Sequence, residues 1–185
     1  YIPKSNASWF CCDNKSGGSI VAQFFLDSRH KRPAYLAGSE DTTTSIDREK
    51  GFLEIMNKNG VDTLREVGNY NYNEAYAATI RLMERSDPAD CIFCSNDIMA
   101  FGAIDAIRSG MKLRVPEDVS IIGFDDIPMT SWPSFNLTTV RQPVRDMVDA
   151  SVEDLISRIK EPDNPPNHKV IMGELIVRGS SRIPL

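Results

Sequence analysis

Short apolar runs alternate with helix-patterned segments along most of this chain, and the alternation limits the folds it can adopt. The runs 33–38, 90–94 and 119–124 are dominated by apolar residues, which is typical of strands covered on both faces. Segments with helical spacing of apolar residues, roughly 10 to 15 residues long, separate them. The sequence therefore predicts an α/β fold with a doubly wound parallel sheet.

The remaining segments complete this pattern. A proline-rich link at 162–166 separates the last predicted helix from a final extended segment. Helices are expected at 19–28, 46–58, 73–85, 97–109 and 143–159, and further extended segments at 63–67, 136–140 and 169–177.

Composition and charge exclude several classes of protein. Hydrophobic residues make up 41% of the 185 residues, enough for a folded core. The net charge of −5 is opposite to that of a compact nucleic-acid-binding module, so this chain alone is not expected to bind DNA. The sequence contains no apolar run of about 18 residues, the length that a membrane-spanning helix needs. Because the chain begins at Tyr1, we expect a piece of a longer protein.

Polar side chains follow the predicted strands, where an open parallel sheet binds its ligands. Asn96 and Asp125 can exchange hydrogen bonds with several hydroxyl groups, and Tyr70 offers a flat face for a sugar ring. These residues predict a polyol site. The alternative is that Asn96 or Asp97 only caps a helix and that Asp125 and Asp126 only form a turn.

Other chemistries find little support in the sequence. The glycine-rich motifs of dinucleotide and phosphate sites are absent. A magnesium-dependent phosphoacceptor at Asp125 and Asp126 lacks a third acidic residue nearby. Neither His30 nor His168 accompanies a G-x-S-x-G nucleophile motif. We therefore expect no enzymatic activity and no cofactor.

The four cysteines favour packing over metal binding. Cys91 and Cys94 are three residues apart on a predicted strand, so their side chains project to opposite faces and cannot share one ion. Cys11 and Cys12 have the same geometric problem, which leaves a four-cysteine zinc site as a minor alternative. No metal site is predicted, and so few cysteines favour a reducing cytoplasm over secretion.

An ordered set of motifs covers almost the whole chain: Asp13-Asn14, Gly17-Gly18, His30-Lys31-Arg32, Tyr35 to Gly38, Arg48 with Gly51-Phe52, Ser95-Asn96-Asp97, Ala100 to Ala103, Val115 to Ser120, Gly123 to Asp126, Thr138 to Pro143 and Glu174 to Ser181. Together they resemble the lactose-repressor-like (LacI/GalR) family of bacterial transcription regulators, specifically its effector-binding core. That core is similar to periplasmic sugar-binding proteins. The resemblance implies a periplasmic-binding-protein-like, Rossmann-like subdomain.

The resemblance also implies roles for individual residues. Arg48, in the R-x-x-G-F pattern, would bind effector hydroxyl or acidic groups. Asn96 and Asp125 would line the effector cleft, and Tyr70 would stack on the ligand. Gln142 lies where the chain crosses between subdomains, as a hinge or a ligand contact. The effector would be a small sugar or sugar phosphate.

The family forms homodimers, and this chain carries matching segments. The helix after Asn96 and the loop after Asp126 would form the interface, with Met129 and Trp132 as anchors. The alternative is that Trp132 packs into its own core.

The family's topology predicts how the chain divides. Residues 1–11 would be a remnant of an amino-terminal subdomain, and residues 12–141 the carboxyl-terminal effector-binding subdomain. Residues 142–163 would return to the amino-terminal subdomain, and residues 164–185 would end the carboxyl-terminal one. The helix-turn-helix that binds operator DNA in the family, and most of the amino-terminal subdomain, would lie outside this chain.

The sequence thus predicts an effector sensor of a repressor-like regulator, in which a sugar alters operator binding allosterically. A periplasmic sugar-binding transport receptor of the same fold is the alternative, and a phosphoacceptor or nucleotide-dependent enzyme ranks last.

Overall fold

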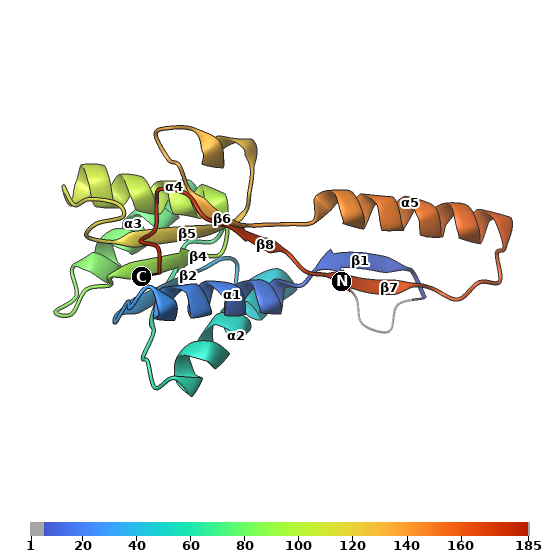
Figure 1. Cartoon of the computed structure of the whole chain (residues 1–185), viewed down its shortest axis with the longest axis horizontal. Helices are drawn as coiled ribbons and strands as arrows, with labels where there is room; N and C mark the ends of the chain where they lie inside the picture. The colour runs from blue at the N-terminus through green and yellow to red at the C-terminus, as the bar shows by residue number, and fades with distance from the viewer. Residues whose placement is uncertain (1–5, 185) are drawn as a thin grey trace.

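The computed structural model describes residues 6–184, and most of these surround one six-stranded sheet (Figure 1). Its strands are β2 (Pro33–Ala37), β3 (Leu64–Val67), β4 (Cys91–Cys94), β5 (Ser120–Asp125), β6 (Thr138–Arg141) and β8 (Glu174–Ile176). They lie in the order β3-β2-β4-β5-β6-β8. Neighbouring strands are parallel except β6 and β8, which are antiparallel. The predicted α/β fold with a mostly parallel sheet is confirmed.

Helices cover both faces of this sheet, as a doubly wound fold requires (Figure 1). Consecutive strand residues enter opposite cores: Tyr35 packs in the core under α1 and α2, and Leu36 in the core under α3 and α4. The helices are α1 (Asn14–Asp27), α2 (Thr43–Lys58), α3 (Tyr72–Met83) and α4 (Asp97–Asp105), with a π-helical turn at Ala106–Gly110 and a 3-10 helix at Pro128–Ser131.

Each of these four helices begins after a residue whose side chain accepts a hydrogen bond from the first turn; these residues are Asp13, Thr42, Asn71 and Asn96. Helix α1 begins earlier than the predicted 19–28 segment, because Asp13 caps it and Gly17 and Gly18 lie inside it. Glycine weakens an isolated helix, but here it permits close packing. A Cβ atom on Gly18 would lie 2.1 Å from the carbonyl oxygen of Arg48 in α2.

A second, smaller unit extends from the main sheet (Figure 1). It contains β1 (Trp9–Cys12), its parallel partner β7 (His168–Ile171) and the helix α5 (Val144–Lys160). The extended segment predicted at 169–177 is therefore two strands in two sheets. Within the range 164–185, β7 lies beside β1, and only β8 belongs to the main sheet. Residues 1–5 of the predicted remnant lie outside the described residues.

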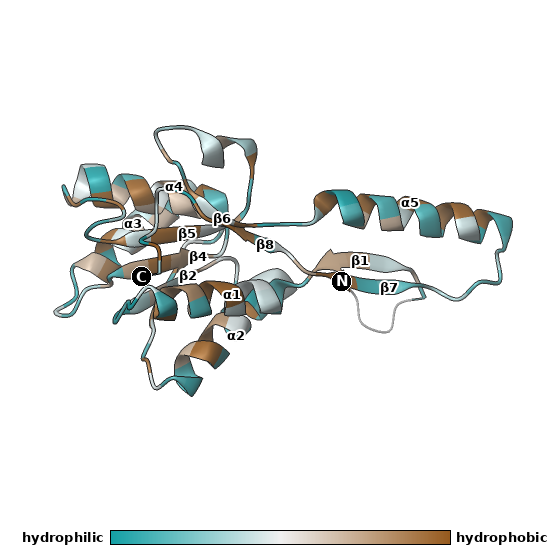
Figure 2. Cartoon of the chain, in the orientation of Figure 1, coloured by the Kyte–Doolittle hydropathy of each residue, from teal (hydrophilic) through white to brown (hydrophobic). Residues whose placement is uncertain are grey.

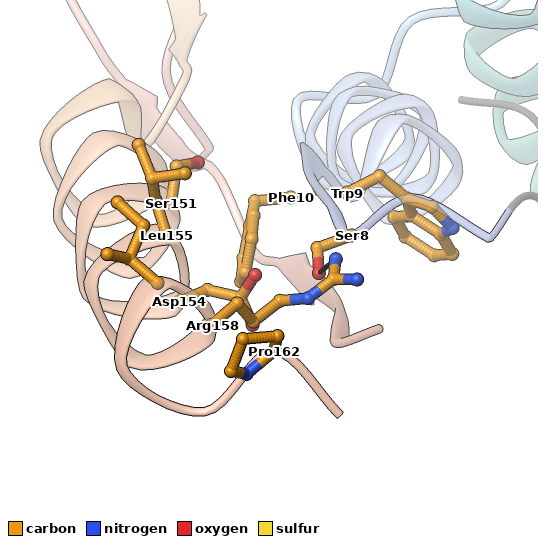
Figure 3. Close-up of a pocket in the computed structure, with 9 residues that line it drawn as sticks. Ser8, Trp9, Phe10, Ser151, Asp154, Leu155, Arg158 and Pro162 are labelled. Atoms are coloured by element: carbon orange, nitrogen blue, oxygen red, sulfur yellow. Dashed lines mark hydrogen bonds between the residues drawn. The ribbon is translucent and has the colours of Figure 1, made fainter. Parts of the chain in front are cut away.

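Hydrophobic residues recur along helix α5 (Figure 2), and several of them are exposed. None of its residues, all of which the structure describes, is buried. A groove of about 680 Å³ runs between α5 and β1, with Phe10, Leu155 and Arg158 among its lining residues (Figure 3). The exposed apolar side chains of α5 are Val144, Val148, Val152, Leu155, Ile156 and Ile159.

The cysteines follow the predicted packing. Cys91 lies in the core under α1 and α2, and Cys94 in the core under α3 and α4. All four cysteines belong to the described residues and are free. Within residues 6–184, no helix combines the length and the apolar character needed to cross a bilayer.

Candidate functional site

A buried arginine organises the carboxyl edge of the sheet. Arg48 lies in the second turn of α2, and only 4% of its surface is exposed. Its guanidinium carbon lies 3.6 Å from the ring centroid of Phe124, a cation–π contact. Its Nε donates to Asn14 Oδ1 at 2.8 Å, and its Nη1 to the Ser95 carbonyl at 2.5 Å. Helix α2 begins before the predicted 46–58 segment, because the Thr42 side chain caps it, so Arg48 lies in its second turn.

Asp125 is the acidic partner of this arginine. Its Oδ1 lies 3.6 Å from Arg48 Nη2 and accepts a hydrogen bond of 2.6 Å from Gln142 Nε2. Burial raises the pKa of the Asp125 carboxyl, although Arg48 and Gln142 oppose this effect. Arg48, Asp125 and Gln142 therefore form one cluster. The cluster combines the N–H donors of Arg48 and Gln142 with the acceptor oxygens of Asp125, groups that can bond sugar hydroxyls.

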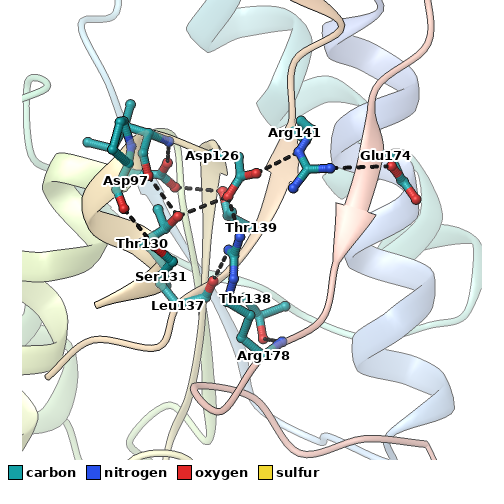
Figure 4. A network of polar contacts seen from close by, with 12 residues as sticks. Asp97, Asp126, Thr130, Ser131, Leu137, Thr138, Thr139, Arg141, Glu174 and Arg178 are labelled. Carbon is teal, nitrogen blue, oxygen red and sulfur yellow. Dashed lines mark hydrogen bonds and ion pairs between the residues drawn. The ribbon is translucent and has the colours of Figure 1, made fainter. Parts of the chain in front are cut away.

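The turn that begins at Asp125, the last residue of β5, has an unusual backbone. Asp125 and Asp126 have φ angles of 120° and 60°. Residues other than glycine rarely adopt such angles, which cost about 1–3 kcal/mol per residue. Asp126 Oδ2 accepts from Arg141 Nε at 2.6 Å, and Asp126 Oδ1 from Arg178 Nη2 at 2.7 Å (Figure 4). The turn expected from the sequence is present, and these contacts hold it in place.

Asp97 anchors the same turn from the start of α4. Its Oδ2 accepts from the Ile127 N–H at 3.0 Å, and its Oδ1 from the Thr139 hydroxyl at 2.6 Å (Figure 4). Gly123 leaves room for this carboxyl, because a Cβ there would lie 2.3 Å from Asp97 Oδ1. Burial raises the pKa of Asp97 to about 7, although its hydrogen bonds with Thr139 and Ile127 oppose this shift. Asp97 is thus a buried support of the site.

Replacing Asp97 with asparagine is expected to change how stability depends on pH. Because the pKa of Asp97 is higher in the folded chain, the unfolded chain releases this proton first as pH rises, and stability is lost between about pH 4 and 7. The difference between the free energies of unfolding of the wild type and of Asp97→Asn should fall by roughly 1 kcal/mol per pH unit from about pH 5 to 7. Urea denaturation at several pH values measures this slope.

The matched control is Asp118→Asn. Hydrogen bonds with Arg114 lower the pKa of Asp118 to about 2, so this group has no slope in the same pH window. Parallel stability curves for the wild type and Asp97→Asn would contradict the assignment.

Tyr70 lies at the same edge of the sheet. A Cβ on Gly38 would lie 2.2 Å from Tyr70 Cζ, so the ring packs directly on that glycine. Its hydroxyl oxygen lies 3.3 and 3.2 Å from the hydroxyl oxygens of Thr42 and Thr44. Burial tends to raise the pKa of Tyr70, but hydrogen bonds with these threonines outweigh it, and the pKa is lowered. Tyr70 as a stacking platform stays a prediction.

Asn96 caps helix α4, as the alternative interpretation of the sequence describes. Its Oδ1 accepts from the Met99 N–H at 2.9 Å at the start of α4. Its side chain has no recorded hydrogen bond with Arg48, Asp125 or Gln142, all of which lie in the described part of the chain. The backbone of its neighbour Ser95 instead contacts Arg48. A ligand role for Asn96 stays a prediction.

Sequence reasoning missed Asn14 as a site residue. Asn14 follows β1 and begins α1, so it lies after a strand in the same way as the residues that were predicted. The signal was hidden because β1 was not expected to be a strand. Asn14 fixes the direction of the Arg48 guanidinium through the 2.8 Å hydrogen bond.

A group with metal-ligand chemistry lies at the opposite end of the sheet. Ligand atoms of His30, Asp90 and Cys91 lie within 4.8 Å of one another. Arg182 Nη2 lies 2.7 Å from His30 Nδ1. The Arg182 guanidinium therefore already contacts the nitrogen that a metal ion would need. Burial opposes ionisation of Asp90, but the nearby His30 ring and hydrogen bonds from the Lys31 and Arg32 N–H groups hold its pKa well below the usual range. These contacts favour a structural role.

Comparison with known proteins identifies the family. A family model described as "Periplasmic binding protein-like domain" matches residues 22–181. The chain is 33% identical over 173 residues to the probable HTH-type transcriptional repressor ExuR of Bacillus subtilis (strain 168), covering 92% of this chain and 52% of that protein. It spans about half the length of the curated relatives it matches.

Solved structures agree with this result. The transcriptional regulator CelR–cellobiose complex has a TM-score of 0.88 and 29% identity, covering 97% of this chain and 56% of that chain. A sugar-binding transcriptional regulator (LacI family) from Escherichia coli, complexed with phosphate, has a TM-score of 0.85 and 31% identity, covering 99% and 66%. The predicted resemblance to lactose-repressor-like regulators is confirmed. The chain belongs to the family of periplasmic binding protein-like domains.

Proposed function

We propose that this chain is the effector-sensing part of a bacterial transcriptional regulator and that it binds a small sugar. The observation that carries the proposal is the cluster of Arg48, Asp125 and Gln142. It lies at the carboxyl edge of the sheet, and Gln142 stands between β6 and α5, where the chain passes into the smaller unit. The sugar-binding descriptions of two structural neighbours support this ligand class.

The sensor works by differential affinity. A sugar that contacts both the main sheet and the smaller unit favours one relative orientation of the two, because a ligand shifts an equilibrium only by binding one state better. Three connections join the units: β1 to α1, β6 to α5, and β7 to β8. In this proposal, 12–141 and the part of 164–185 that carries β8 form the effector-binding subdomain, whereas 1–11, 142–163 and β7 belong to the other.

Operator DNA would be bound by a helix-turn-helix outside this chain. The HTH-type repressor that the chain resembles is about twice as long as the matching part, and the net charge of −5 gives this chain little attraction for DNA. The proposed sensor has no catalytic role. Four free cysteines favour a reducing cytoplasm over the periplasmic location of a transport receptor.

A phosphoacceptor enzyme is disfavoured by the same turn. The Asp126 carboxylate is occupied by Arg141 and Arg178, and Asp125 pairs with Arg48. Both carboxylates are therefore committed to protein cations, which leaves no open acidic pair for Mg²⁺.

Direct sugar binding tests the proposal. We expect cellobiose or D-ribose at about 10 mM, a range that detects millimolar affinity, to shift the NMR signals of the Arg48 guanidinium and the Gln142 side-chain amide. Signals of Asn59, whose side-chain amide bonds only its own helix, should not move. If mono- and disaccharides and their phosphates all leave these site signals unchanged, the proposal is wrong.

The homodimer is a further part of the proposal. Trp132 lies in the loop after Asp126 with 53% of its surface exposed, and Met129 is only partly buried, against the core under α3 and α4. An exposed tryptophan is a typical interface anchor. Trp132→Ala is expected to raise the dimer dissociation constant at least about tenfold, since such anchors contribute about 2 kcal/mol or more.

Light scattering across a concentration series measures this change. Ile183→Ala is the control, because Ile183 is also exposed but lies near the opposite end of the sheet, beside Arg182. A monomeric mass for the wild type at high concentration would rule out the dimer.

A further inference from the structure

The turn that begins at Asp125, the last residue of β5, carries two consecutive carboxylates that face different partners. Asp125 contacts Arg48 and Gln142, whereas Asp126 contacts Arg141 and Arg178. Both have positive φ angles, 120° and 60°, which a side chain normally disfavours. Such a backbone persists only where surrounding contacts hold it.

The Asp126 side chain fastens this turn to three separate elements. It receives hydrogen bonds from Arg141 in β6, from Arg178 after β8, and from the Thr130 hydroxyl at 2.9 Å in the 3-10 helix (Figure 4). Only 7% of the side chain is exposed. Burial opposes ionisation, but the hydrogen bonds with Arg141 and Arg178 lower the pKa of Asp126, so it is a carboxylate at neutral pH.

Arg141 connects this anchor to the second half of the site. It is the last residue of β6, directly before Gln142, and it pairs in register with Asp125 on β5. The ion pair between Arg141 and Asp126 therefore fixes the backbone on both sides of the 2.6 Å hydrogen bond between Gln142 and Asp125.

We propose that Asp126 is a positioning residue that directs the Asp125 carboxylate toward Arg48 and Gln142 and thereby sets the affinity for the effector. The effect of Asp126 on effector affinity rests on the proposed function, whereas its effect on the position of the Asp125 carboxylate does not. Asp126 acts through Asp125 and does not touch the sugar itself.

The test begins without any ligand. The hydrogen bond to the Asp125 carboxylate changes the NMR chemical shift of the Gln142 side-chain amide. Comparison with Asp125→Ala, which lacks this bond, measures that change. We expect two variants to abolish this change in chemical shift. Asp126→Asn keeps the shape of the side chain but removes its charge, and Asp126→Glu keeps the charge but lengthens the side chain. Asp118→Asn breaks an ion pair with Arg114 on another loop and should leave the signal unchanged.

Binding then separates positioning from general damage. Asp126→Asn is expected to weaken cellobiose or D-ribose binding about tenfold, but to cause no further loss in the Asp125→Ala background, because the two residues act through one contact. If Asp126→Asn does not fold, Thr130→Val removes one of the three hydrogen bonds without changing charge and should shift the Gln142 signal partway.

Two outcomes distinguish this inference from the proposed function. An unchanged Gln142 signal in folded Asp126 variants overturns the positioning role, even where sugar binds normally. Loss of the change in chemical shift in both variants supports the positioning role even where no sugar binds the wild type, and in that case only the proposed function fails.

Discussion

Effector binding is expected to weaken ten- to a hundredfold when Asp125 is replaced by alanine. Asp125 and Arg48 form a largely buried pair, and removing one partner of a charge-assisted hydrogen bond costs about 1.5–3 kcal/mol, or one to two powers of ten in affinity. Gln142 Nε2 loses its acceptor in the same variant. Arg48→Ala should have an effect of similar size, with an additional loss of stability.

Calorimetry with cellobiose or D-ribose measures these affinities, on the longest form of the protein that contains this chain. Asp118→Ala is the matched control, because Asp118 also pairs with an arginine but lies away from the site. If Asp125→Ala and Arg48→Ala both leave the affinity and the fold unchanged, these residues serve only as parts of a turn and a helix.

Stability is expected to fall by about 3 kcal/mol in Gly51→Ala, at the upper end of typical overpacking effects. A Cβ on Gly51 would lie 1.9 Å from the carbonyl oxygen of Lys15, a backbone atom that cannot rotate away. The two helices would have to separate. Because Gly18 makes the reciprocal approach to the Arg48 carbonyl, this separation would also displace Arg48 from Asn14.

Urea denaturation compares Gly51→Ala with Lys50→Ala, an exposed neighbour on the same helix. The control should change stability by no more than about 0.5 kcal/mol. An equally small effect of Gly51→Ala would show that α1 and α2 tolerate a wider spacing and that their contact does not position the arginine.

The alternation of apolar runs and helical segments was sufficient to predict the main sheet. Strands such as β4 and β5 are buried on both faces, so their apolar character is continuous and visible in one dimension. The same reasoning placed Cys91 and Cys94 on opposite faces, which the two cores confirm. The rule that ligands bind after parallel strands selected Tyr70, Asn96 and Asp125, whereas Arg48 was predicted only from the resemblance to the family.

Partner choice at the ends of the chain could not be predicted in this way. The segment 169–177 is extended throughout, but β7 pairs with β1 and β8 with β6. Each of these strands has three or four residues, too few to encode a partner in their own pattern. Their pairing depends on where the three connections leave the main sheet.

The sequence by itself determined which residues are apolar on both faces, which residues cap helices and which polar groups follow strands, because these properties depend on near neighbours in the chain. Only the tertiary structure decided that Asn14 orients Arg48, and that Asp126 faces Arg141 and Arg178 while Asp125 faces Arg48. These choices depend on donors from distant parts of the chain, and a backbone with positive φ at Asp125 and Asp126 persists only because those donors are present.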